Sequence, residues 1–86
     1  MKQAMNLPKI FDDMKRGASA LLGVDVDYIG KFSLGESDFV GNFDITAYVS
    51  GGGKYAKCFY DHVEDTVSVE KVTKSEFDNA SGVELE

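Results

Sequence analysis

The side chains best suited to chemistry form one cluster, at Asp61, His62, Glu64 and Asp65. Carboxylate oxygens and imidazole nitrogens are common ligands of divalent cations. The spacing matches neither an EF-hand loop nor a zinc motif, since the chain has one histidine and one cysteine. No serine or cysteine nucleophile can be assigned to His62 as a general base. The pattern therefore predicts a solvated acidic turn, with no metal site and no catalytic residue.

The string Gly51-Gly52-Gly53-Lys54 looks like part of a phosphate-binding loop. Such a loop needs a glycine at position 48, a serine or threonine at position 55, and a following helix whose N–H groups point at the phosphate. Tyr48 and Tyr55 occupy those positions, and a strand pattern follows. The string therefore indicates a hairpin turn, and we predict no cofactor.

The remaining candidates for catalysis also have structural explanations. Cys58 lies in an alternating strand pattern, where a cysteine is ordinarily a small buried side chain and not a reactive thiolate. Asp25 and Asp27 alternate with valines, which places both carboxylates on a solvent-facing side. Paired-carboxylate catalysis needs at least one carboxyl group in apolar surroundings. We therefore predict that the protein is not an enzyme.

Aromatic side chains are the strongest binding candidates, with six phenylalanines and four tyrosines in the chain. Tyr48 lies on the outer face of its predicted strand. Tyr55 and Phe59 share that face in one pairing of the hairpin, and Tyr60 does so in the other. The predicted partner-binding residues are Tyr48, Tyr55 and Phe59, and the predicted partner is another protein or a second copy of the chain. Alternatively, these rings pack only across strands on a half-wet face.

Size and charge restrict the class of protein. The 86 residues suffice for one domain, predicted over 1–78, with a disordered tail over 79–86 that ends in a Leu-Glu pair typical of cloning. No apolar run approaches the roughly 18–20 residues that cross a bilayer. The net charge of −6, with a single arginine, disfavours direct nucleic-acid binding. The lone cysteine and the absence of a secretory signal predict a cytoplasmic location.

A helix is predicted over residues 8–22. Asn6-Leu7-Pro8 is a typical helix start, apolar residues recur at helical spacing from Ile10 to Leu22, and Gly23 supplies a stop. Gly17 inside this helix indicates close approach to a sheet.

After the helix the apolar period changes from 3.6 to 2, which is typical of strands. A turn is predicted at Gly35–Asp38, Phe39 shares the core-facing side of the second strand, and Gly41 marks a bulge or a bend. The four predicted strands cover residues 24–34, 39–49, 54–61 and 66–73.

The pairing of the second and third strands has two alternatives. A two-residue loop at Gly51-Gly52 pairs Ile45 with Cys58, whereas a three-residue loop pairs Ile45 with Phe59 and turns Cys58 outward. We favour the first, because it gives the helix-facing side a continuous apolar set and leaves Lys57 outside. The predicted fold class is α+β, with one N-terminal helix packed on a three- to four-stranded antiparallel β-meander.

The helix, the strand residues 42–49, the glycine turn and residues 55–72 together resemble PepSY-type and cystatin-like small domains. The same order is similar to the gas-vesicle accessory protein O family. The likeness covers roughly residues 18–72, but the chain lacks the secretory context of PepSY domains and the arginine-rich final strand of the gas-vesicle family. The resemblance implies a non-enzymatic accessory or inhibitory module, and no functional residue carries over.

Three functions follow as hypotheses. The leading one is a small acidic protein-binding module that acts through the open face of its sheet and self-associates in the simplest case. The second is an acidic inhibitor, of the kind that phages encode, which occupies the basic surface of a nucleic-acid-binding protein. The third is a small-ligand carrier with a cleft around Met14, Cys58 and Tyr60.

Overall fold

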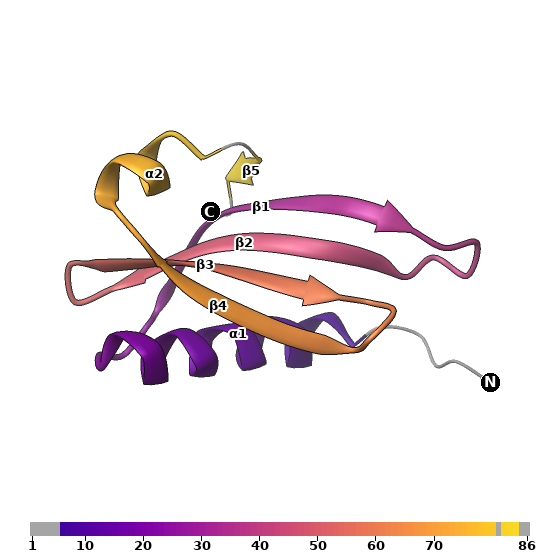
Figure 1. Ribbon diagram of the computed structural model, residues 1–86, viewed down its shortest axis with the longest axis horizontal. Helices are drawn as coiled ribbons and strands as arrows, with labels where there is room; N and C mark the ends of the chain where they lie inside the picture. Colours follow the sequence, from indigo (N-terminus) through magenta and orange to yellow (C-terminus); the bar gives the residue numbers. More distant parts are fainter. Residues whose placement is uncertain (1–5, 81, 85–86) are drawn as a thin grey trace.

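The computed structural model describes residues 6–80 and 82–84 (Figure 1). β1 to β4 form an antiparallel meander, and β5 pairs with the outer edge of β1, so the sheet order is β4-β3-β2-β1-β5. The predicted α+β fold, with an N-terminal helix and an antiparallel β-meander, is confirmed. The elements are α1 (Leu7–Leu22), β1 (Tyr28–Ser37), β2 (Phe43–Gly51), β3 (Lys54–Asp61), β4 (Thr66–Val72), α2 (Lys74–Asp78) and β5 (Val83–Glu84).

α1 begins and ends where the capping residues predict. The Asn6 side chain accepts a hydrogen bond from Lys9 N at 3.2 Å, and Gly23, with φ +73°, donates its N–H to Ser19 O at 2.9 Å. A Cβ on Gly17 would lie 3.0 Å from Val69 Cγ2, so the predicted close approach to the sheet is confirmed. The buried stripe of the helix is Ile10, Met14, Ala18 and Leu22.

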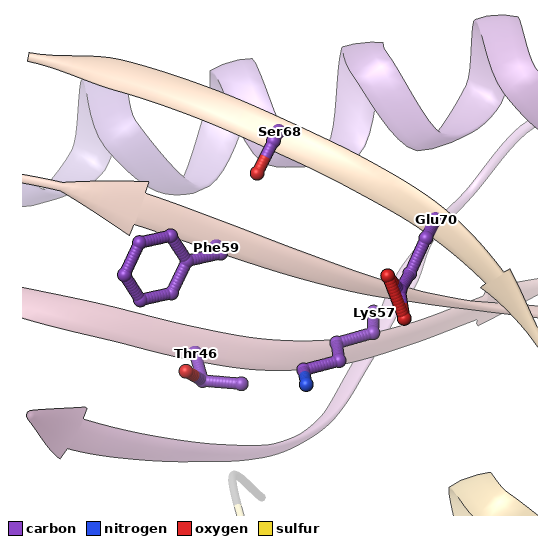
Figure 2. A pocket seen from close by; sticks show the side chains of 5 residues that line it. All are labelled: Thr46, Lys57, Phe59, Ser68 and Glu70. Carbon is purple, nitrogen blue, oxygen red and sulfur yellow. The ribbon is translucent and has the colours of Figure 1, made fainter.

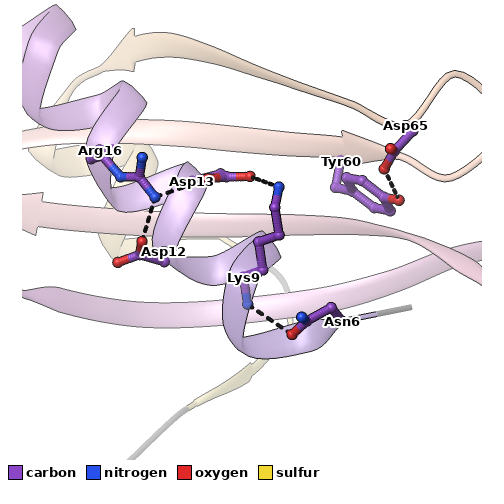
Figure 3. A network of polar contacts seen from close by, with 7 residues as sticks. All are labelled: Asn6, Lys9, Asp12, Asp13, Arg16, Tyr60 and Asp65. Atoms are coloured by element: carbon purple, nitrogen blue, oxygen red, sulfur yellow. Dashed lines mark hydrogen bonds and ion pairs between the residues drawn. The ribbon is translucent and has the colours of Figure 1, made fainter. Parts of the chain in front are cut away.

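The exposed side of α1 carries ion pairs between side chains three or four residues apart (Figure 3). Lys9 Nζ lies 2.9 Å from Asp13 Oδ2, and Arg16 contacts Asp12 and Asp13 one turn back. Such exposed pairs add little to helix stability, because solvent screens the attraction between their charges. The helix is therefore held in place by its buried stripe and not by its charges. Within the described chain, neither helix is long and apolar enough to cross a bilayer.

The core lies between α1 and one face of the sheet, and α2 lies on the opposite side (Figure 1). α1 packs mainly on β3 and β4. Phe11 reaches β1 through an edge-to-face contact with Phe32, at a centroid distance of 6.2 Å. The inward-facing strand residues are Ile45, Ala47 and Val49 of β2 with Ala56, Cys58 and Tyr60 of β3.

The hairpin between β2 and β3 turns at Gly52-Gly53, so both predicted registers are wrong. Ile45 pairs with Tyr60, and Gly51 pairs with Lys54 inside the ladder. Both turn glycines have positive φ, 58° and 76°, as a type I′ turn requires. A Cβ on Gly51 would lie 2.0 Å from Asp25 O, so this strand position requires a glycine. The three identical residues therefore have different roles, one in the ladder and two in the turn.

The first strand begins later than predicted, because residues 24–27 do not pair with the sheet. They cross beside the end of β2, where Asp25 O faces Gly51, and Val26 N donates to Ser19 Oγ at 2.9 Å. The alternation of Val24 to Asp27 therefore reflects packing at the end of the core and not a strand.

The first hairpin turns at Asp38–Asn42 and not at Gly35–Asp38. Asp38 Oδ1 accepts hydrogen bonds from Val40 N and Asn42 N, each at 3.0 Å. Gly41 has φ +97° and forms a bend within this turn, so of the predicted bulge or bend the structure has the bend. Phe39 is fully exposed, although the alternating pattern placed it on the core side. The carboxylate of Asp38 decided the turn, since it satisfies two backbone donors at once.

The described chain continues after β4 as α2 and β5, and residue 79, where the predicted tail begins, directly follows α2. Thr73 and Glu76 form a capping box that begins α2, and β5 pairs with Lys31 and Phe32. Lys31 Nζ donates to Asp78 O at 3.2 Å and to Ala80 O at 2.9 Å, which holds the chain beside β1. Residues 81, 85 and 86, including the predicted cloning-derived pair, lie outside the described residues.

Candidate functional site

Tyr48, Tyr55 and Phe59 lie on the sheet face opposite α1, here called the open face. Strand alternation and the observed register place them there: Tyr48 is opposite Lys57, and Phe59 is opposite Thr46. The inward residues of the same strands are buried against α1. The structure thus brings the three predicted partner-binding residues to one face, although their neighbours differ from those of either predicted register.

Tyr55 already has an intramolecular partner. Its ring centroid lies 4.9 Å from that of Phe77 in α2. Phe77 also covers Gly30, where a Cβ would lie 2.6 Å from Phe77 Cζ. The glycine creates the space that this ring occupies. α2 therefore covers the Tyr55 end of the open face, and the predicted role of Tyr55 as a contact for another molecule competes with this packing.

A pocket lies on the open face between β2, β3 and β4, and Figure 2 shows the side chains that line it. This shallow pocket of about 310 Å³ is lined by Thr46, Lys57, Phe59, Ser68 and Glu70. The phenylalanine is 36% exposed, and Lys57 stands opposite Glu70 on the neighbouring strand. An apolar ring beside one cation and one carboxylate can bind an amphipathic protein surface.

A second group of side chains lies where the two hairpin turns meet. Asp44 Oδ1 is 2.6 Å from His62 Nδ1 and also accepts the backbone N–H of His62 at 3.0 Å. Asp38 Oδ2 is 4.0 Å from the other ring nitrogen, Nε2. Ligand atoms of Asp44, Asp61 and His62 all lie within 4.8 Å of one another. These three could hold a divalent cation, and the two hydrogen bonds between Asp44 and His62 already join β2 to the β3–β4 turn.

This group differs from the acidic turn that the sequence indicated. His62 is buried at 6% exposure, while Asp65 leaves the cluster and accepts a 2.7 Å hydrogen bond from the Tyr60 hydroxyl (Figure 3). Asp38 and Asp44 were missed because they belong to the other hairpin. The observed register, in which Ile45 pairs with Tyr60, brings Asp44 opposite the end of β3. Neither predicted register has this pairing, so neither could have placed Asp44 beside Asp61.

Cys58 and Tyr60 are buried between the sheet and α1, at the position of the predicted ligand cleft. Burial raises the pKa of the Cys58 thiol to about 12, and its Sγ lies 3.6 Å from Met14 O. Burial, together with the hydrogen bond to Asp65, raises the pKa of Tyr60 to about 12. Met14 and Cys58 are both fully buried. Helix and sheet are therefore in direct contact at the position of the predicted cleft. Neither the Cys58 thiol nor the Tyr60 hydroxyl ionises near neutral pH.

No protein-family model matches this chain, and no curated protein or solved structure matches it significantly. The resemblance to PepSY-type, cystatin-like and gas-vesicle accessory domains accordingly stays a prediction.

Proposed function

We propose that this chain is a small, acidic, non-enzymatic protein-interaction module. It binds through the part of the open face that α2 leaves uncovered, with Phe59 and the neighbouring Tyr48 as its aromatic contacts. The carrying observation is the exposed Phe59 ring beside the 310 Å³ pocket. Binding would bury this ring, which is worth roughly 25 cal/mol for each Å² of apolar surface removed from water.

A second copy of the chain is the simplest partner for this surface. Lys57 and Glu70 lie side by side in the pairing of β3 with β4. In a twofold symmetric contact the same patch meets itself, so a patch that carries both charges can place each opposite its complement. A uniformly acidic patch would repel its own copy, and this patch is not uniform.

The chemistry of the chain supports a binding role in the cytoplasm. Its single cysteine is a buried thiol whose raised pKa opposes thiolate formation. A chain without disulfides suits a reducing compartment.

Light scattering over a concentration series tests the proposal. The wild-type mass should rise from monomer to dimer with concentration, and Phe59→Ser and Tyr48→Ser should remain monomeric. Val63→Ser is the matched control, because Val63 is 72% exposed in the β3–β4 turn, away from the pocket. A wild-type mass independent of concentration would exclude self-association, and a dimer that survives both open-face substitutions would exclude this face.

A second candidate is the acidic inhibitor of a nucleic-acid-binding protein. The observation that favours it is that Asp38, Asp44 and Asp61 gather around His62. This candidate predicts that a protein partner of the chain also binds DNA or RNA. In a gel-shift assay the chain should then displace the nucleic acid, and simultaneous binding of both would contradict the candidate.

A further inference from the structure

Phe39 at the tip of the β1–β2 turn is 100% exposed, and its neighbour Val40 is 55% exposed. The turn itself does not need these apolar side chains. Its backbone is closed by Asp38 N to Asn42 O at 2.9 Å and Gly41 N to Asp38 O at 3.1 Å, in addition to the bonds that the Asp38 carboxylate accepts. Exposed turn positions ordinarily carry small polar residues. An aromatic side chain held entirely in solvent is therefore a candidate contact for another molecule.

The turn is also held in one shape. Two of its backbone N–H groups donate to Asp38, whose carboxylate lies near His62 of the neighbouring hairpin. A loop that is ordered before binding loses less conformational entropy on association than a flexible one. The hydrogen-bonded turn therefore holds the backbone of Phe39 in place before any partner binds.

Among the described residues, the charged side chains of the two hairpin turns are all carboxylates. Residues 34–44 and 61–66 contain no lysine or arginine. Lys9 Nζ forms an ion pair with Asp13 at 2.9 Å, and Asp13, with a smaller contribution from Asp65, raises the pKa of Lys9. The carboxylates of the two turns, here called the acidic end, are Glu36, Asp38, Asp44, Asp61, Glu64 and Asp65.

The sign of this charge selects the kind of partner. Phosphate backbones and anionic lipid headgroups are repelled by a carboxylate-rich end. A second copy would bring a like-charged end against it. A protein with lysine or arginine around an apolar pocket is attracted, because the field steers the encounter while the aromatic ring supplies the buried contact.

We infer that the β1–β2 turn is a docking element whose Phe39 side chain enters an apolar, basic-rimmed pocket on a partner protein. This surface is separate from the pocket at Phe59, so the inference goes beyond the proposed self-association. Phe39 is the anchor, Val40 extends the apolar contact, and the acidic end sets orientation and partner choice.

The test replaces Phe39 by the photo-crosslinking residue p-benzoylphenylalanine in the full chain, within lysate of cells that make it. The same replacement at Leu21, which is 46% exposed near the C-terminal end of α1, is the control. A protein captured from position 39 and not from position 21 is then purified and titrated calorimetrically with wild-type chain, Phe39→Ser, Leu21→Ser and the charge reversal Glu64→Lys. Thermal melting verifies that each variant is folded.

We expect Leu21→Ser to bind like wild type and Phe39→Ser to bind at least about tenfold more weakly, as for a central aromatic contact. Glu64→Lys should weaken binding several-fold, and added salt should weaken the wild-type complex. Absence of a protein specific to position 39, capture of only a second copy or of lipid, or an affinity indifferent to Phe39→Ser would overturn the inference. Light scattering of Phe39→Ser distinguishes this result from failure of the open-face proposal, because its self-association should be unchanged.

Discussion

Asp44 is the side chain through which the two hairpin turns are joined. One of its oxygens meets both the ring Nδ1 and the backbone N–H of His62, at 2.6 and 3.0 Å. His62 is almost entirely buried, so its polar groups depend on partners within the protein. The bond also keeps the β3–β4 turn beside Asp38 and hence beside the exposed Phe39.

Replacement of Asp44 by alanine should therefore destabilise the fold. It leaves two buried donors of His62 without this acceptor, which costs about 1–3 kcal/mol of the free energy of unfolding. Urea unfolding measures the change. Asp27→Ala is the control, since Asp27 is exposed, and it should change stability by less than about 0.5 kcal/mol. Equal effects of the two substitutions would contradict the role of Asp44.

The buried Cys58 and Tyr60 predict a loss of stability in alkali. Burial raises the pKa of each group, from 9.0 and 10.0 to about 12. The unfolded chain therefore releases these protons at lower pH than the folded chain does, and the free energy of unfolding falls as pH rises from about 9 to about 12. Urea unfolding at increasing pH measures this slope, which should flatten in Cys58→Ala and Tyr60→Phe. An unchanged slope in both variants would show that other groups cause it.

At the scale of elements, close backbone contacts determine where β2 ends and how β1 accommodates α2. Position 51 requires a glycine because Asp25 passes directly over it, whereas a Cβ on Gly53 would meet no described residue within 4 Å other than its chain neighbours. Gly30 lies where β1 shifts register, and it makes room for the ring of Phe77. Each glycine thus serves a different contact.

The substitution Gly51→Ala should destabilise more than Gly53→Ala. At position 51 the added methyl meets the backbone of Asp25 and Val26, which has to move, at a cost of roughly 2–3 kcal/mol. At position 53 the cost is the positive φ of 76°, about 1 kcal/mol for alanine. Chemical denaturation measures both. The reverse order would mean that the turn is not at Gly52-Gly53.

Phe77→Ala should loosen α2 without unfolding the core. The substitution removes the ring that packs on Tyr55 and Gly30, an aromatic contact worth about 1 kcal/mol. Hydrogen exchange should accelerate at the amides of residues 74–80 and stay slow in β2 and β3. Val63→Ala, in the distant β3–β4 turn, is the control. Faster exchange throughout the sheet would show that α2 is part of the cooperative core.

At the scale of the whole molecule, the proposed binding surfaces occupy separate places. The pocket at Phe59 lies on the open face, with Lys57 and Glu70 in its lining. Phe39 lies in the turn between β1 and β2, within the acidic end. Figure 1 shows this turn projecting beyond the turn between β3 and β4. Mixed charge suits contact with a second copy, and uniform negative charge suits a basic partner.

The two surfaces should respond independently to substitution. Phe59→Ser should abolish self-association and leave the affinity for a basic partner within about twofold, while Phe39→Ser should do the opposite. The effects in the double variant should add, because sites without shared contacts are usually additive within about 0.5 kcal/mol. Light scattering and calorimetry on the four proteins measure both responses. Loss of both activities in either single variant would mean that one surface carries both.

The sequence by itself determined the elements whose signals are local. The cap at Asn6, the apolar stripe of α1 and the stop at Gly23 fix a helix through contacts within a few residues. The period of 2 fixes β3 and β4 and places Tyr55 and Phe59 on one face of β3, because alternation within a strand needs no knowledge of the partner strand. That Tyr48 of β2 shares this face follows only from the register. The α+β class follows from these periods alone.

Tertiary structure decided everything that depends on contacts between distant residues. Three consecutive glycines offer equivalent turns in the sequence, and the pairing of Asp44 with His62 follows only from the register that the folded sheet adopts. The exposure of Phe39 follows from the hydrogen bonds of Asp38, which compete with an alternating pattern that also fits a strand. Contacts across the fold are worth more free energy than these local preferences, so local pattern could not settle them.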